Sequence, residues 1–303
     1  MKILISDPID DKVVKELKNY GKLLSKGEEA KADVIIVRSP TKVDKDYIDK
    51  AKNLKLIVRA GSGLDNIMDI DYCTKKGIKV VNTPEASSIA VAELVFAHML
   101  AIARNMVYCN NTIKKCEWRK KELIGFELYG KTLGIIGLGR IGNAVAERAE
   151  AFGMNILAYD PFVRSSEYKL VELSQLLRKS DIITLHVPLN ESTKSMIDKN
   201  EFRLMKNGVV IINTSRGGII NDDELLRNLK NRRLSFAGLD VFREEPPENL
   251  PLRKLDNVIL TPHIGAQTVE TKRRIGKLIV EKLKLYSRSL NERQDYVVQK
   301  LGK

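Results

Sequence analysis

The sequence of 303 residues predicts an α/β protein built from two doubly wound parallel sheets. Short runs rich in isoleucine and valine, such as KILIS, DVIIVRS and NILAYD, alternate with amphipathic stretches. Near-continuous apolar strands joined by helices are typical of parallel sheets that are buried on both faces. This alternation runs twice, and one long helical pattern from Ser87 to about Lys115 separates the two series. The length also exceeds that of one typical domain.

The first series predicts four strands, at residues 2–6, 33–39, 54–60 and 78–83. Amphipathic periodicity predicts helices over residues 11–21 and 44–53, and Gly21 closes the first of them. The long pattern that follows reads as a single helix, with Ser87 or Ser88 as its N-cap.

The second series predicts a strand over residues 132–137, a helix over 143–153, and further strands at 155–160, 181–189, 209–215, 236–242 and 257–263. A last helix begins at about Thr268 and can return to the first domain. We therefore expect a discontinuous domain of residues 1–99 plus 280–303, and a second domain of residues 100–279.

The net charge of +13 requires an interpretation. A strongly basic chain can attract an acidic partner, either nucleic acid or a phosphorylated metabolite. The alternative is a lysine-rich solvated surface, which we favour because the basic residues are spread out, with only short runs such as KNRR and TKRR. We expect no nucleic-acid partner.

Cysteine spacing and apolar runs limit the other classes of protein. Cys73, Cys109 and Cys116 are odd in number and lack C-x-x-C spacing, so we predict neither a disulfide framework nor a metal site. The N-terminus lacks the layout of a signal peptide, and no apolar run reaches 18 residues. The expectation is a cytoplasmic protein with no membrane partner.

Gly137, Gly139 and Gly142 form a G-x-G-x-x-G motif between an isoleucine-rich strand and an alanine-rich helix. The first glycine permits the tight turn, the second lets the backbone approach a pyrophosphate, and the third lets helix and strand pack closely. Asp160 ends the next strand, 18 residues after Gly142, where a carboxylate can bind a ribose and repel a 2′-phosphate. The motif predicts NAD as the cofactor, and the alternative is a tight turn with a surface aspartate.

Several polar side chains follow strands of the second series and should gather at one edge of the sheet. Hydride transfer from a secondary alcohol needs a base, a cation for the substrate and an anion beside the base. His263 in TPHIGAQT can take the hydroxyl proton, because an imidazole titrates near working pH. Arg216 in NTSRGG can bind a carboxylate or a ketone oxygen, and Glu245 in FREEPP can stabilise the imidazolium.

The same residue types also occur in loops that carry no chemistry. Taken singly, Arg216, Glu245 and His263 each also fit an ordinary surface position. His98, inside the long helical pattern, is interpreted as structural. His186 is expected to line the cofactor rather than act as a base, because Pro188 fixes a loop close to the dinucleotide.

Along nearly its whole length the chain resembles the D-isomer-specific 2-hydroxyacid dehydrogenases. The resemblance rests on Arg216, Glu245 and His263, separated by 29 and 18 residues, and on the stretches GLDVFREEPP and TPHIGAQT. In that family an arginine, a glutamate before a proline and a histidine form the catalytic set, so the resemblance implies this role here. It also implies a Rossmann NAD-binding domain and a flavodoxin-like substrate domain.

The stretches VRAGSGLDNI, GKTLGIIGLGRIG and FGMNILAYDP resemble the branch of the family that oxidises 3-phospho-D-glycerate. The resemblance implies that the substrate carboxylate region is held by Arg59, Gly61, Ser62 and Gly63. It also implies phosphate contacts from Lys75 and, reaching a neighbouring subunit, from Lys120 near Trp118. Some relatives carry arginine at these two positions, and lysine lacks the bidentate fork.

The predicted cofactor-binding residues lie on the glycine loop and at the ends of the following strands. They are Gly137, Gly139, Arg140, Ile141, Gly142, Asp160, His186, Pro188, Thr193, Thr214, Ser215, Asp240, Gly265 and Ala266.

The resemblance implies NAD-dependent oxidation of 3-phospho-D-glycerate to 3-phosphohydroxypyruvate, a step of serine biosynthesis. It further implies a homodimer formed through the NAD-binding domain. Because few residues follow the last predicted helix, we expect a short form without a regulatory domain. A glyoxylate or hydroxypyruvate reductase is the alternative within the family. A dinucleotide-sensing or nucleic-acid-binding protein is the alternative from another class, and the intact set of Arg216, Glu245 and His263 argues against it.

Overall fold

The computed structural model describes residues 1–301, with side chains up to residue 288, and divides the chain into two compact units. Unit 1 comprises Met1–Ser87 and Ala266–Lys303, and unit 2 comprises Ser88–Gly265. The division falls at the N-terminal ends of two long helices, whereas the sequence reading placed it inside them, after residues 99 and 279. Helical periodicity reveals an apolar face but not the sheet that this face covers.

Unit 1 contains one sheet of five parallel strands in the order β2-β1-β3-β4-β5. The strands are β1 (Lys2–Ile5), β2 (Lys22–Leu24), β3 (Val34–Val37), β4 (Leu56–Arg59) and β5 (Lys79–Asn82). The four predicted strands are confirmed. The prediction omitted β2, whose three residues are too few to show a pattern.

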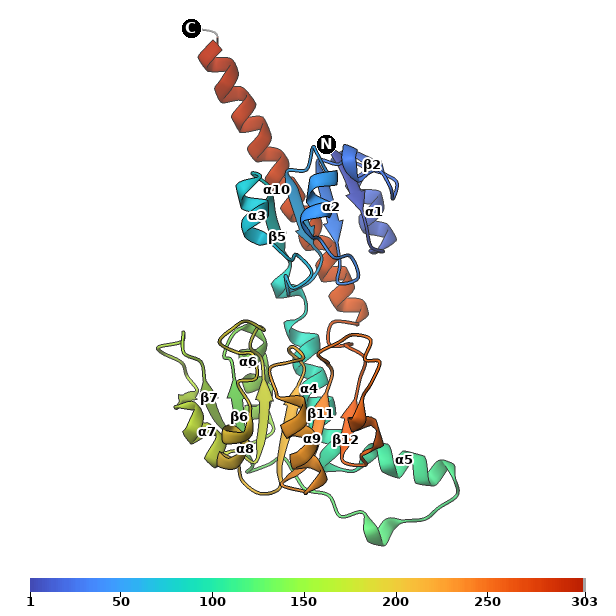
Figure 1. Ribbon diagram of the computed structural model, residues 1–303, viewed down its shortest axis with the longest axis vertical. Coiled ribbons are helices and arrows are strands. Elements are labelled where there is room, and N and C mark those ends of the chain that lie inside the picture. Colours follow the sequence, from blue (N-terminus) through green and yellow to red (C-terminus); the bar gives the residue numbers. More distant parts are fainter. Residues whose placement is uncertain (302–303) are drawn as a thin grey trace. The chain divides into compact units, whose positions relative to one another are not determined.

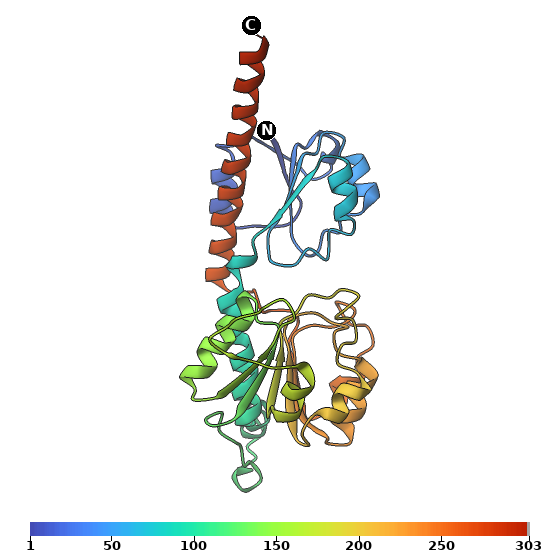
Figure 2. The same ribbon diagram turned by 90° about the vertical axis from the view of Figure 1, so that its left-hand side faces the viewer.

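Helices cover both faces of this sheet (Figure 2). They are α1 (Asp11–Leu17), α2 (Lys45–Lys50), α3 (Ile70–Lys75) and α10 (Val269–Leu301), with short 3-10 turns at Glu29–Lys31 and Pro84–Ala86. Leu17 of α1 and Ile279 and Leu283 of α10 are buried against one face. Ile48 of α2 and Cys73 of α3 are buried against the other. The described part of α10 thus returns to the first unit.

Unit 2 contains seven parallel strands in the order β12-β11-β10-β9-β6-β7-β8. The strands are β6 (Thr132–Ile136), β7 (Asn155–Tyr159), β8 (Lys169–Leu170), β9 (Ile182–Leu185), β10 (Val209–Asn213), β11 (Leu234–Leu239) and β12 (Val258–Leu260). All six predicted strands are confirmed, and the two-residue β8 was not predicted. The two parallel sheets confirm the predicted fold class.

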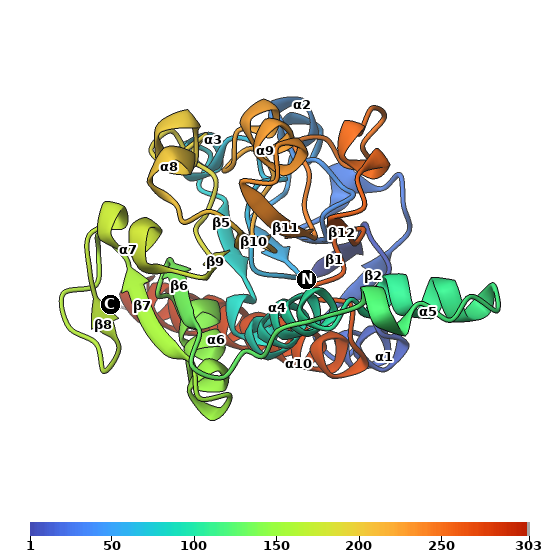
Figure 3. The same ribbon diagram turned by 90° about the horizontal axis from the view of Figure 1, so that it is seen from below.

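The helices of unit 2 form a layer on each face of its sheet (Figures 1 and 3). They are α4 (Ser88–Ala103), α5 (Met106–Lys114), α6 (Arg140–Ala151), α7 (Leu173–Lys179), α8 (Lys199–Leu204) and α9 (Asp222–Lys230), with 3-10 turns at Lys120–Glu122 and Pro251–Lys254. Val95 of α4 and Val145 of α6 are buried on one face. Leu177 of α7, Phe202 of α8 and Leu225 of α9 are buried on the other.

The single long helix predicted from Ser87 to Lys115 is wrong in one respect. The helix begins at Ser88 as expected, but it breaks after Ala103, and α5 continues at an angle of 61° to α4. Asn105, between the two helices, has a φ of 49°, in the left-handed region that asparagine tolerates better than most residues. This conformation is incompatible with a continuous right-handed helix.

Among the described residues no single helix is long and apolar enough to cross a bilayer. Within the part of the chain that the structure describes, one bent pair, α4 and α5, meets the criteria of length and composition together.

Candidate active site

The predicted cofactor and catalytic residues of unit 2 follow six strands that are neighbours in one sheet, namely β12, β11, β10, β9, β6 and β7. In a parallel sheet the carboxyl ends of neighbouring strands meet at one edge, and ligands bind beyond that edge. The loops after these strands are in close backbone contact. A Cβ atom on Gly217 would lie 2.0 Å from the Phe242 carbonyl oxygen, so only glycine fits between the loops after β10 and β11.

The glycine loop after β6 has the geometry that a dinucleotide pyrophosphate requires. Gly137 has a φ of 92°, and a Cβ atom there would lie 2.7 Å from the carbonyl oxygen of His186. A Cβ atom on Gly142 would lie 2.1 Å from the Gly137 carbonyl oxygen, so the helix packs directly on the turn. By contrast, no atom lies within 4 Å of the position of a Cβ atom on Gly139, which leaves room for a ligand.

Helix α6 begins at Arg140, and no side chain caps its N-terminus. The first N–H groups of a helix lack partners within the helix and carry a partial positive charge. The Asp160 carboxylate accepts hydrogen bonds from the backbone N–H groups of Leu138 (2.9 Å) and Phe162 (2.9 Å). It is therefore held beside the glycine loop, as a ribose-binding carboxylate would be.

His263 and Glu245 form a hydrogen-bonded pair. The Nδ1 atom of His263 lies 2.5 Å from Oε2 of Glu245, and Oε1 of Glu245 accepts a hydrogen bond of 3.0 Å from the Phe242 N–H. Burial raises the pKa of Glu245, but the hydrogen bonds from His263 and Phe242 and the nearby positive charge of Arg216 outweigh it and hold the pKa below its ordinary value. The carboxylate is therefore ionised at neutral pH and can stabilise an imidazolium.

The loop that carries His263 is held by hydrogen bonds to the carboxylate of Asp240. Asp240 follows β11 and is fully buried. Its Oδ1 atom accepts hydrogen bonds from the Thr261 hydroxyl (2.6 Å) and the Ile264 N–H (2.8 Å), and its Oδ2 atom accepts one from the Gly265 N–H (2.9 Å). The Asp240 carbonyl accepts the His263 N–H at 2.8 Å. His263 has a φ of 53°, a left-handed conformation that these contacts maintain.

Arg216 is half-buried in the loop after β10 and donates to the Ser215 carbonyl at 2.6 Å. Asn213, the last residue of β10, orders this loop. Its amide donates to the Arg216 carbonyl at 2.8 Å, and its Oδ1 atom accepts from the Ser215 N–H (3.0 Å) and hydroxyl (2.7 Å). We did not predict this role for Asn213; its signal in the sequence is a polar amide that ends a buried apolar strand.

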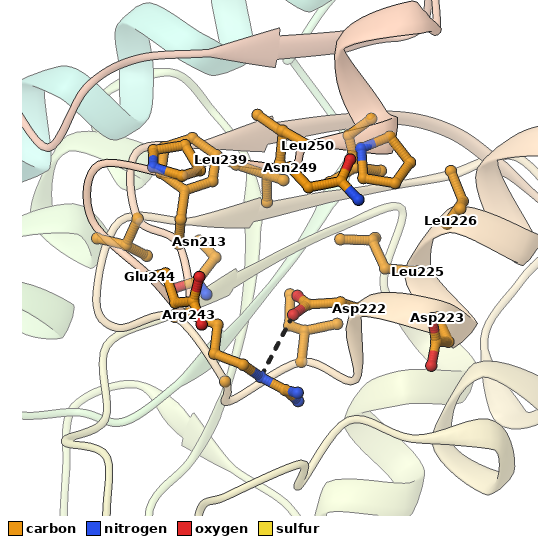
Figure 4. A pocket seen from close by; sticks show the side chains of 18 residues that line it. Asn213, Asp222, Asp223, Leu225, Leu226, Leu239, Arg243, Glu244, Asn249 and Leu250 are labelled. Atoms are coloured by element: carbon orange, nitrogen blue, oxygen red, sulfur yellow. Dashed lines mark ion pairs between the residues drawn. The ribbon is translucent and has the colours of Figure 1, made fainter.

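Two cavities border these loops. The first, about 390 Å³ in volume, is lined by Phe242, Glu245, Pro246, Pro247, Leu260, Thr261, Pro262 and His263, so the imidazole and the carboxylate both face open space. The second, about 270 Å³, lies between the loop after β11 and helix α9 (Figure 4). Its rim carries the Asp222–Arg243 ion pair, with 3.5 Å between Arg243 Nε and Asp222 Oδ2.

Two predicted cofactor residues have buried polar atoms without a protein partner among the described residues. These atoms are Nδ1 of His186 and Oγ1 of Thr214, after β9 and β10. Burial lowers the pKa of His186 to about 3, so its ring is neutral, and its Nε2 atom lies 3.0 Å from the Thr184 hydroxyl. Because buried polar atoms normally have partners, the two atoms fit a site for a polar ligand.

The remaining predicted cofactor positions are more exposed. The Thr193 hydroxyl donates to the Pro188 carbonyl at 2.6 Å and closes the loop after β9. Ile141, in the first turn of α6, and Ala266 are half-buried.

Unit 1 holds the predicted carboxylate-binding residues at the end of β4. The Arg59 guanidinium donates to Ser39 Oγ (2.8 Å), Asn66 Oδ1 (3.3 Å) and the Ala60 carbonyl (3.1 Å). It also packs on Gly61, where a Cβ atom would lie 1.6 Å from Nη1. The Ser62 hydroxyl lies 2.7 Å from that of Ser87. Arg59, Gly61, Ser62 and the adjacent Gly63 thus form one polar cluster.

The two predicted phosphate-binding lysines lie apart from these clusters within their own units. Lys75 is exposed at the end of α3. Lys120 is exposed in the segment between α5 and β6, which lies at the end of unit 2 opposite the carboxyl ends of its strands (Figures 1 and 2). Contact of Lys120 with a substrate in a neighbouring subunit stays a prediction. Among the described residues no group of three or more histidine, cysteine, aspartate or glutamate side chains is arranged to hold a metal ion.

A glycine loop at a helix N-terminus, together with a carboxylate-backed imidazole at the same sheet edge, is typical of dinucleotide-dependent oxidoreductases. Residues 96–265 match the NAD binding domain of the D-isomer specific 2-hydroxyacid dehydrogenases. The chain belongs to this family, as its sequence predicted.

Two curated relatives are equally similar to the chain. A D-3-phosphoglycerate dehydrogenase of Methanocaldococcus jannaschii is 47% identical over 94% of this chain, which spans only 57% of that protein's length. A hydroxypyruvate reductase of Thermotoga maritima is 47% identical over 93% of this chain and 97% of its own length. Among solved structures, an Aquifex aeolicus D-lactate dehydrogenase complexed with NAD and lactic acid is 32% identical, with a TM-score of 0.84 over 96% of this chain and 97% of that one.

The glycine loop generates a test of cofactor binding. In Gly139→Ala the new methyl group meets no protein atom and the φ of −76° suits alanine, so the melting temperature should stay unchanged. The methyl group should nevertheless block the pyrophosphate and raise the Kd for NADH about tenfold or more, measured by fluorescence titration. The matched variant Gly142→Ala should lower the melting temperature as well, because its methyl group meets backbone. Wild-type NADH affinity in Gly139→Ala would show that this loop does not hold the dinucleotide.

Proposed function

We propose that this protein is an NAD-dependent dehydrogenase of D-2-hydroxy acids that oxidises 3-phospho-D-glycerate to 3-phosphohydroxypyruvate. The observation that carries the proposal is the His263–Glu245 pair, 2.5 Å apart beside an open cavity, with the positive charge of Arg216 acting on Glu245. This arrangement supplies the base, the anion and the cation that oxidation of a hydroxy acid requires.

Each side chain of the set has a separate task. Because Nδ1 of His263 is hydrogen-bonded to Glu245, Nε2 is the nitrogen that takes the substrate hydroxyl proton. The ionised Glu245 stabilises the resulting imidazolium, and Arg216 holds the substrate carboxylate and polarises the C2 oxygen. Bound NAD supplies the acceptor for the hydride that leaves C2. The products are the ketone, the reduced nicotinamide cofactor and one proton on His263.

The phosphorylated substrate is supported by the similarity to the Methanocaldococcus jannaschii D-3-phosphoglycerate dehydrogenase. Phosphate contacts from Lys75 and Lys120, and carboxylate contacts from the Arg59–Gly63 cluster, belong to this proposal. A role in serine biosynthesis and a cytoplasmic location also belong to this proposal.

A second candidate is reduction of hydroxypyruvate or glyoxylate by the same catalytic set. It is favoured by the Thermotoga maritima hydroxypyruvate reductase, which this chain matches over 97% of that protein's length. The two candidates differ only in the far end of the substrate, because His263, Glu245 and Arg216 act on atoms common to all 2-hydroxy acids.

We also infer that the protein is a homodimer that associates through unit 2. Apolar side chains of α5 and the segment after it are exposed to solvent, among them Met106, Ile113, Trp118 (80%) and Ile124 (88%). Apolar patches of this kind mark interaction surfaces. Sedimentation analysis should give the mass of two chains.

Substrate identity is decided by steady-state kinetics with one preparation of enzyme. The proposal predicts the highest kcat/KM for 3-phospho-D-glycerate with NAD, at least about tenfold above those for D-glycerate and glycolate, since a lost charge-assisted phosphate contact costs about 1.5–3 kcal/mol. A higher kcat/KM for the unphosphorylated acids would instead support the reductase.

The role of His263 is tested separately by His263→Ala. The side chain is 41% exposed, so its removal should lower the melting temperature only modestly, through the lost hydrogen bond to Glu245 and the left-handed backbone at residue 263. Turnover should fall about 10²–10⁴-fold, the range for loss of a positioned general base, while the Kd for NADH stays near that of the wild type. A wild-type turnover rate would reject His263 as the base.

A further inference from the structure

His98 lies in helix α4, whose other buried side chains are almost all apolar. The side chain is only 2% exposed and packs on Gly238 of β11, where a Cβ atom would lie 2.9 Å from the His98 Nδ1 atom. A polar ring in such a position is destabilising unless it makes a hydrogen bond. The single partner that the described residues offer is the Thr261 hydroxyl, 3.2 Å from Nε2.

The direction of this hydrogen bond follows from the neighbouring contact. The Thr261 hydroxyl has one hydrogen atom and donates it to Oδ1 of Asp240 at 2.6 Å. Its oxygen can therefore only accept from His98, so the proton of the imidazole must be on Nε2. His98 therefore donates to the Thr261 hydroxyl, and the Thr261 hydroxyl donates to the buried carboxylate of Asp240.

The protonation state of His98 agrees with this assignment. Its Nδ1 atom is buried without a partner among the described residues, so no second proton is stabilised there. Burial lowers the pKa of His98 and outweighs the opposing charge of Asp240. The ring is a neutral donor with one proton, on Nε2.

We propose that His98 is a positioning residue for the reaction, because its Nε2–H fixes the Thr261 hydroxyl on Asp240 and so fixes the loop that carries His263. The same carboxylate accepts the Ile264 and Gly265 N–H groups, so the Thr261 hydroxyl and the two amides share one anchor. A rotated Thr261 hydroxyl leaves Oδ1 with one donor fewer, and the left-handed backbone at His263 with less support. This inference rests on the proposed role of His263 as the base.

A simple packing role for His98 makes different predictions from a positioning role. Glutamine can place its amide nitrogen where Nε2 of histidine lies, whereas the shorter asparagine amide corresponds to Nδ1. Leucine fills the space and donates nothing. If packing is all that matters, leucine should be the best of the three replacements; if the donor matters, glutamine should be.

The experiment compares His98→Gln, His98→Leu and His98→Asn in the full chain, with the melting temperature measured for each. We expect kcat to fall about fivefold in His98→Leu and His98→Asn, with the KM for NAD within about twofold, since a lost hydrogen bond to a neutral partner is worth about 1 kcal/mol. His98→Gln should retain at least half of the wild-type kcat. Amide hydrogen exchange at residues 261 and 263–265 should be faster in His98→Leu and near wild type in His98→Gln.

A Thr261→Val variant completes the test. If His98 acts through Thr261, adding His98→Leu to Thr261→Val should lower kcat no further. Wild-type kcat and exchange in His98→Leu, or an equal loss in His98→Gln, would overturn the role of His98. His263→Ala, assayed alongside, separates the two proposals: a wild-type rate there overturns the proposed function, whereas an inactive His263→Ala beside a fully active His98→Leu overturns only the role of His98.

Discussion

The arrangement of the site depends on one buried carboxylate, that of Asp240. It is fully buried at the end of β11 and accepts three hydrogen bonds from the loop after β12. A buried charge is strongly destabilising unless hydrogen-bond donors surround it. The loop conformation that brings these donors to Asp240 is therefore favoured. In that conformation the His263 N–H reaches the Asp240 carbonyl, and the imidazole reaches Glu245.

The parallel sheet of unit 2 places this carboxylate at the edge where its strands end. Six neighbouring strands end at one edge, and glycines allow their loops to come into contact: Gly137 approaches the His186 carbonyl, and Gly217 approaches the Phe242 carbonyl. Side chains from loops far apart in sequence can therefore share one space. The glycine loop leaves an uncapped helix N-terminus at the same edge, where the charge of a dinucleotide is stabilised. In the proposed function, cofactor binding and proton transfer therefore depend on the same strand ends.

Much of this arrangement is readable from the sequence because it is local. Alternating apolar runs indicate the two sheets, and the spacing of Gly137, Gly139 and Gly142 predicts a turn that the structure contains. The break at Asn105 depends on a single backbone conformation that no periodicity records. The contact between His98 and Thr261 joins residues 163 positions apart, so it becomes visible only when α4 packs on the sheet. The sequence pattern therefore predicts Arg216, Glu245 and His263 as the side chains with chemistry, but it does not predict that Asn213 and His98 support the loops around them.

The central claim is that His263 acts as a base whose protonated form is stabilised by Glu245. The most direct measurement is the pH dependence of kcat for oxidation in the wild type and in Glu245→Gln, with the adjacent Glu244→Gln as a matched control. In the wild type the rate should rise with pH, because only the neutral imidazole accepts the proton. Removing the carboxylate should lower the rate and move the rising part of the pH profile toward acid, while Glu244→Gln keeps the wild-type profile. An unchanged pH profile in Glu245→Gln would contradict the account.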